Sequence, residues 1–145
     1  MNYTRLVLAA VVATVVDAAY GFLVWGKVLA GEFGRYPEIY RGGDDMSGFP
    51  LMFAGIFVGM LVASYIYAKG YEGGSSLMEA ISFGVVIAVL MAAYSSGTSF
   101  GTMRIGKKMA LTYLAGGFGE WLLAGIAIGL VYKPSAGAVT RAAGV

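Results

Sequence analysis

The strongest constraint on this chain is a set of four long apolar segments. They cover about residues 6–26, 49–68, 77–97 and 109–132. A bilayer core is about 30 Å thick, and a helix needs about 20 mostly apolar residues to cross it. The sequence therefore predicts an all-α integral membrane protein, a four-transmembrane-helix bundle with one long interfacial loop between helices 1 and 2.

The domain organisation follows from these segments. We expect a single transmembrane domain over residues 1–133 and a C-terminal tail over residues 134–145. Asp17 interrupts the first segment, which favours a retained span over a cleaved signal peptide. The first loop carries the aromatic residues Phe33, Tyr36 and Tyr40 among charges of both signs. Such a loop is either a lid or docking surface, or a connector in the headgroup layer.

Composition excludes several classes of function. Only 12% of the residues are charged, against about 25% in globular domains. The chain has no Cys and no His, so it lacks thiol chemistry and the commonest metal and haem ligand. We therefore expect no metal and no cofactor, although bound lipid is compatible with the sequence. A net charge of +2 is too small to indicate nucleic-acid binding.

Two acidic residues lie deep in the apolar segments, with no basic residue at comparable depth. They are Asp17 in the first segment and Glu120 in the fourth. An acid at this depth costs several kcal/mol unless it is protonated, paired or hydrated, and it marks a functional site by default. The sequence predicts a buried polar site for an ion or a proton there, with acids that only fix helix register as the alternative. Glu79 lies in the first turns of the third segment, where it is better explained as a satisfied interface residue.

Several polar side chains lie at a similar depth in the segments and are candidate hydrogen-bond partners for the two acids. The supporting hydroxyls are Thr14, Tyr20, Tyr65, Tyr94 and Tyr113, and Ser64, Trp25 and Trp121 are further candidates. Trp121 follows Glu120 directly and points about 100° away from it, which makes it a poor partner. If the two acids approach each other, they should share a proton. If they lie apart, each is protonated or hydrogen-bonded singly.

Small residues recur at four-residue spacing in every segment. Membrane helices pack through such residues because they let backbones approach closely. The expected packing positions are Ala13, Gly21, Gly55, Gly59, Gly84, Gly116, Gly125 and Gly129. Asp17 and Glu120 fall on two of these stripes, so both acids should point into the bundle.

Basic residues cluster in the third loop. Arg104, Lys107 and Lys108 follow a run rich in hydroxyls and glycines, and could contact a lipid phosphate. The run lacks the spacing of a phosphate-binding loop, so a polar turn is the simpler interpretation. The basic residues differ little in number between the two sides, so the sequence leaves the orientation open. With this cluster on the cytoplasmic side, the positive-inside rule would place both termini outside.

The layout resembles two kinds of small four-span protein. An acid in the first span, an aromatic first loop, and the motifs YIYAKGYEGG (65–74) and GEWLLAGIAIGLVYK (119–133) resemble bacterial families known only as domains of unknown function. That resemblance implies a helical bundle in a bacterial inner (cytoplasmic) membrane. Four spans with an acid in the first also resemble small multidrug-resistance exporters. The long first loop and long spans depart from that family, which argues against membership.

The sequence favours a small non-catalytic membrane protein over an enzyme, because it shows no catalytic motif. The leading hypothesis is an accessory or structural subunit within a larger membrane complex, with lipids and other subunits or copies of itself as partners. The alternative is a small proton- or cation-coupled transporter or channel that uses Asp17 and Glu120.

Overall fold

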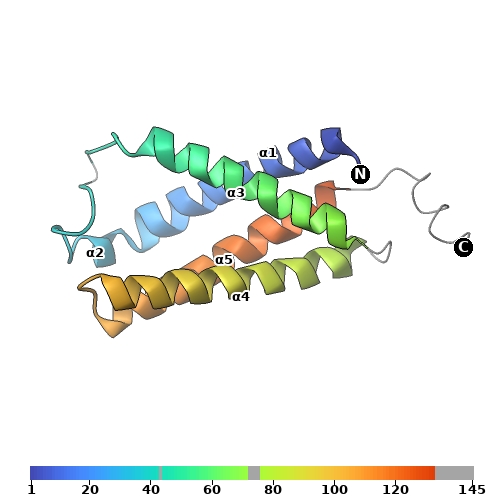
Figure 1. Ribbon diagram of the computed structural model, residues 1–145. Helices are drawn as coiled ribbons and strands as arrows, with labels where there is room; N and C mark the ends of the chain where they lie inside the picture. The colour runs from blue at the N-terminus through green and yellow to red at the C-terminus, as the bar shows by residue number, and fades with distance from the viewer. Residues whose placement is uncertain (43, 72–75, 133–145) are drawn as a thin grey trace, which may run out of the picture.

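The fold is an antiparallel helical bundle. The computed structural model describes residues 1–42, 44–71 and 76–132, and no strand occurs within these ranges. In chain order the helices are α1 (Tyr3–Tyr20), a π-helix η1 (Gly21–Val28), α2 (Ala30–Phe33), α3 (Phe49–Gly70), α4 (Ser76–Thr102) and α5 (Lys107–Val131). Figure 1 shows the long helices lying side by side, with α2 in the loop at one end.

Four helices are long and apolar enough to cross a membrane, namely Tyr3–Val28, Phe49–Gly70, Leu77–Thr102 and Lys107–Val131. The predicted four-helix membrane bundle is therefore confirmed, and the chain is a multi-pass membrane protein by the length and composition of its helices. The third helix runs past the expected end at residue 97. The predicted tail, residues 134–145, lies outside the described residues.

Local sequence explains several helix ends. The side chain of Asn2 accepts a hydrogen bond from the backbone N–H of Arg5 at 3.1 Å, which caps α1. Pro50 lies in the first turn of α3, where a missing N–H costs nothing. In the last turns of α4, the hydroxyls of Thr98 and Thr102 donate to carbonyls one turn earlier. This bonding keeps a polar stretch compatible with a helix.

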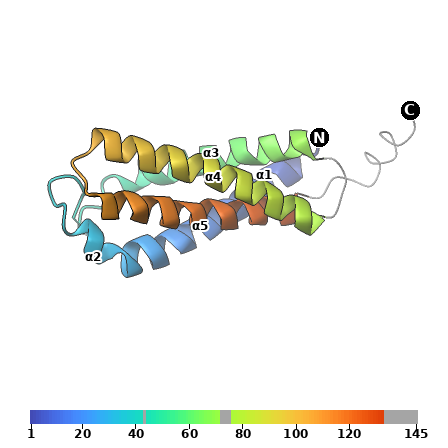
Figure 2. The ribbon, with the colours of Figure 1, turned by 90° about the horizontal axis from the view of Figure 1, so that it is seen from below.

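The closest helix pair is α4 with α5, which lie side by side in Figures 1 and 2. Glycine makes this approach feasible. A Cβ added to Gly125 would lie 2.5 Å from the Cα of Gly84, and one added to Gly84 would lie 2.9 Å from the carbonyl oxygen of Leu122. Gly129 meets Ala80 in the same way. These contacts are backbone against backbone, as in small-residue packing between membrane helices.

The other half of the bundle is built around α1, which packs on both α3 and α5. The buried core lies at the end of the bundle where α1 begins and α5 ends. Its members are Leu6, Ala9, Ala10, Ala13, Met60, Ala63, Tyr67, Ala124, Ile128 and Tyr132. Helix α4 touches α3 where the ring of Tyr67 meets Phe83 at 5.1 Å. Large apolar side chains cover the outward faces, as expected of surfaces that contact lipid.

The predicted packing positions fall into three groups. Ala13 is fully buried, and Gly84, Gly116, Gly125 and Gly129 lie buried against other helices. Gly59 makes only an ordinary contact with the ring of Trp121, and Gly21 faces Trp25 of its own helix. Gly55 differs from the expectation, because it is exposed and an added Cβ there would meet nothing within 4 Å.

The first loop holds a small hydrogen-bonded turn centred on Asp45. Its carboxylate accepts hydrogen bonds from the hydroxyl and the backbone N–H of Ser47 and from the guanidinium of Arg41. The hydroxyl of Ser47 makes the largest contribution among these donors. Together they favour the ionised form and lower the pKa of Asp45 to about 2.

Replacing Ser47 by Ala should raise the pKa of Asp45 toward its ordinary value of about 3.9. Because the pKa is lowered in the folded loop, Asp45 stabilises the turn above its ordinary pKa. This contribution is lost as the pH falls through about 2. A titration of the Asp45 carboxyl carbon by NMR measures both values, with Glu38→Gln as a control that leaves Asp45 unchanged. A wild-type Asp45 that titrates near 3.9 would contradict the described turn.

Candidate functional site

The structure brings the two interior acids together. Asp17 is 5% exposed on the face of α1 that meets α5, and Glu120 is half-buried on α5. The two carboxyl groups lie within electrostatic range of each other. Both residues lie in the described ranges, and no hydrogen bond joins them there. The two acids therefore lie near each other, without the direct hydrogen bond that a shared proton would need. We refer to Asp17 and Glu120 as the carboxyl pair.

The hydrogen-bond donor to the pair is an indole. The Nε1–H of Trp25 donates to Oε1 of Glu120 at 3.0 Å. The Trp25 ring lies against Gly116, where an added Cβ would be 2.9 Å from its Cζ2. Gly116 therefore provides the space in which this ring reaches Glu120. Trp121 points elsewhere, with its ring 3.9 Å from the Cβ position of Gly59.

Trp25 belongs to the π-helix η1, which runs from Gly21 to Val28. Here the N–H of Leu29 bonds to the carbonyl of Val24, five residues earlier. π-Helical turns are rare and occur frequently at functional sites. The wider turn changes the direction of every side chain after Tyr20, and so decides where Trp25 points.

Tyr20 lies beside the carboxyl pair. Its hydroxyl donates to the carbonyl oxygen of Gly116 at 2.9 Å and lies 2.6 Å from the Cβ position of Gly119. Tyr20 also lies within electrostatic range of Glu120. On α5, Gly116 thus leaves room for the ring of Trp25, and Gly119 leaves room for the hydroxyl of Tyr20.

An aromatic cluster covers the pair at the loop end of the bundle. Trp25 contacts Phe33 and Tyr113 with ring centroids 5.9 and 6.0 Å apart, and Phe33 contacts Tyr40 at 4.9 Å. The hydroxyl of Tyr113 donates to that of Tyr40 at 2.9 Å. We call Trp25, Phe33, Tyr40 and Tyr113 the aromatic cap. The first loop thus folds onto the end of the bundle through these aromatic residues.

Polar contacts hold the first loop on the start of α5. The ammonium of Lys108 donates to Glu32 at 2.6 Å, and the backbone N–H of Gly106 donates to the hydroxyl of Tyr36 at 3.1 Å. The bond from Lys108 is the main reason that the pKa of Glu32 is lowered. Of the predicted phosphate contacts, Lys108 is thus engaged with Glu32, whereas Arg104 and Lys107 are exposed beside it.

Among the described residues, the remaining predicted hydroxyls form no hydrogen bond with the pair. Thr14 donates to the carbonyl of Ala10 in its own helix at 2.8 Å. Tyr65 is exposed with the ammonium of Lys69 over its ring, and Tyr94 is 68% exposed. Sequence reasoning included Trp25 among the candidate partners but could not rank it, because the bond to Glu120 spans 95 residues.

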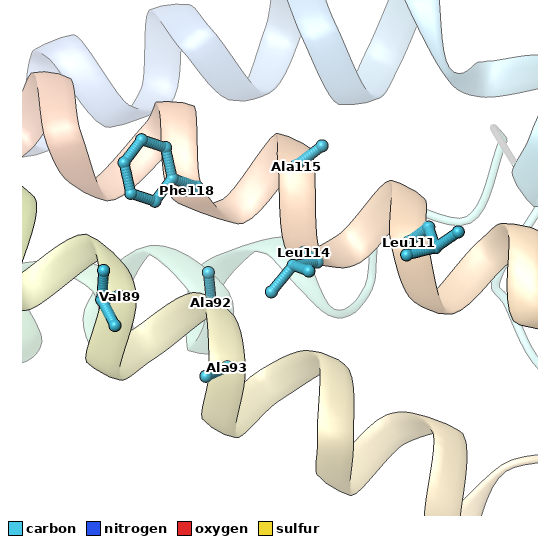
Figure 3. Close-up of a pocket in the computed structure, with 7 residues that line it drawn as sticks. All are labelled: Val89, Ala92, Ala93, Leu111, Leu114, Ala115 and Phe118. Carbon is cyan, nitrogen blue, oxygen red and sulfur yellow. The ribbon is translucent and has the colours of Figure 1, made fainter.

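A shallow groove between α4 and α5 offers no comparable chemistry. It is lined by Val89, Ala92 and Ala93 of α4 and by Leu111, Leu114, Ala115 and Phe118 of α5 (Figure 3). All seven side chains are apolar, so the groove suits a hydrocarbon chain. Within the described ranges, no three acidic residues gather in a way that could hold a metal ion.

Comparisons with protein-family models, curated proteins and solved structures find no match to this chain. The carboxyl pair and its surroundings therefore carry the functional argument.

Proposed function

We propose that this is a small proton- or cation-coupled membrane transporter or channel whose ion site is the carboxyl pair. The observation that carries the proposal is the approach of Asp17 and Glu120 across the α1–α5 contact. Two negative charges in a low-dielectric interior repel each other strongly. A proton or a monovalent cation bound between them reduces that repulsion. The net charge of the site therefore changes each time the ion binds or leaves.

The surrounding residues support binding rather than catalysis. Trp25 fixes one oxygen of Glu120 and leaves the other oxygen and the Asp17 carboxyl to bind the ion. The aromatic cap separates the pair from water at the loop end. A gated site needs such a barrier, and the loop that carries Phe33 and Tyr40 is held by exposed polar contacts that can open. No step requires a nucleophile or a metal.

Proton flux into liposomes tests the proposal. We expect Asp17→Asn and Glu120→Gln each to reduce flux of the reconstituted protein at least about tenfold, because a tenfold change corresponds to only 1.4 kcal/mol. Glu38→Gln is the matched control, since Glu38 is an exposed acid of the first loop. A pH-sensitive dye inside the vesicles gives the rate, and repeating the assay with Na⁺ and K⁺ gradients identifies the ion. Unchanged flux in both pair variants would refute the proposal.

A second candidate is the accessory subunit of a larger complex. Its support is the small-residue surface that the chain leaves uncovered. Gly55 on α3 and Gly97 and Gly101 on α4 are exposed, with open space at their Cβ positions. Such positions admit a close helix from another subunit or copy. Purification from native membranes tests this candidate, and a monodisperse protein without co-purifying subunits would argue against it. The resemblance to bacterial four-span proteins suggests the cytoplasmic membrane as the location.

A further inference from the structure

A second polar cluster lies at the opposite end of the bundle from the aromatic cap. Ser64 and Tyr67 stand three residues apart on one face of α3, with exposed fractions of 0% and 4%. Tyr67 lies within electrostatic range of Glu79 on α4. Its hydroxyl is 3.3 Å from the Cβ position of Gly129 on α5. Helices α3, α4 and α5 thus meet around the side chain of Tyr67.

Among the described residues, the hydroxyls of Ser64 and Tyr67 are buried and have no hydrogen-bond partner. A buried polar group left in this state costs about 1–3 kcal/mol, and most such groups in proteins are paired with protein or with ordered water.

Comparable side chains elsewhere in the chain are paired. The hydroxyls of Thr14, Thr98, Thr102 and Thr112 donate to carbonyls of their own helices. The hydroxyls of Tyr20, Tyr36, Tyr113 and Tyr132 each take part in a hydrogen bond. Ser64 and Tyr67 depart from this behaviour although they are more deeply buried than most of these residues.

The geometry points to a buried water-binding site formed by Ser64, Tyr67 and Glu79. Water suits these groups better than a metal ion, because each hydroxyl needs an acceptor for its proton as well as a donor. The side chain of Tyr67 leans toward the start of its helix and over the turn that carries Ser64, which is the direction in which a shared water would lie. A carboxylate beside such water supplies the acceptor strength that holds it.

The site has a further role if the carboxyl pair binds protons, and this part rests on the proposed function. Glu79 lies in the first turn of α4, near one membrane surface, whereas Ser64 lies deeper along α3. Water between them carries protons inward from that surface.

Water-edited solid-state NMR of the full chain in lipid bilayers tests the site with water itself as the probe. We expect magnetisation from water to reach Ser64 and Tyr67 much faster than Met109, which is equally buried but apolar. Transfer to Ser64 and Tyr67 as slow as to Met109 would overturn the proposal.

A stability measurement gives an independent outcome. If water completes the site, Ser64→Ala and Tyr67→Phe remove a hydrogen-bonded group and lower the Tm by about 2–4 °C. If the hydroxyls are truly unpaired, the same variants raise the Tm, which would also overturn the proposal. Tyr94→Phe is the matched control, because that hydroxyl is on an exposed residue. Neither measurement involves the carboxyl pair, so loss of flux in the pair variants and failure of the water site are separate results.

Discussion

Gly125→Ala should separate α4 from α5 and lower the free energy of unfolding by about 1–3 kcal/mol, the usual cost of overpacking. The added methyl group would lie 2.5 Å from the Cα of Gly84. That atom belongs to the backbone of a long helix, so no side-chain rotation can relieve the clash. Titration of the purified protein with a denaturing detergent, followed by circular dichroism, measures the change.

Gly55→Ala is the matched control for this prediction. Gly55 lies within α3, and an added Cβ there meets nothing within 4 Å. Alanine has the higher helix propensity by roughly 0.5–1 kcal/mol, so this variant should be unchanged or slightly more stable. Equal destabilisation by the two substitutions would show that the α4–α5 contact is looser than the structure has it.

The spanning helices could be predicted from the sequence because length and composition alone decide whether a helix can cross a bilayer. Their ends were less predictable. The expected third span ends at residue 97 because the residues that follow are polar, yet α4 continues to Thr102. The threonine hydroxyls bond back to the helix there, which hydropathy does not reveal. The π-helix was not predicted, because the residues of the first segment read as an ordinary apolar helix.

The candidate site was predictable only in part. The four-residue spacing from Ala13 places Asp17 on the packed face of α1, and Asp17 is indeed buried there. The same reasoning cannot tell which side chain meets Glu120, because that depends on the relative rotation of two helices. Hydroxyls such as Tyr94 share the expected depth but face outward. Depth can be estimated from position along a span, whereas direction toward a partner needs the tertiary structure.

Gly116→Ala should displace Trp25 from Glu120, and this effect would extend from stability to function. The new methyl group would overlap the indole, whose Cζ2 is 2.9 Å from the Cβ position. Trp25 must then rotate, which breaks its 3.0 Å hydrogen bond to Glu120. We expect a loss of about 1–3 kcal/mol in unfolding free energy. In a Trp121→Phe background, where Trp25 is the remaining tryptophan, its fluorescence reports the displacement directly.

The neighbouring Gly117→Ala separates this effect from a general intolerance of side chains on α5. A Cβ on Gly117 lies 3.8 Å from Ala92, an ordinary van der Waals contact. This variant should therefore keep both the wild-type fluorescence and the wild-type proton flux. If the carboxyl pair binds the ion and Trp25 positions Glu120, Gly116→Ala should reduce flux while Gly117→Ala does not. Normal flux with a displaced Trp25 would show that the indole serves packing alone, and the function of the pair would then rest on the two carboxyl groups.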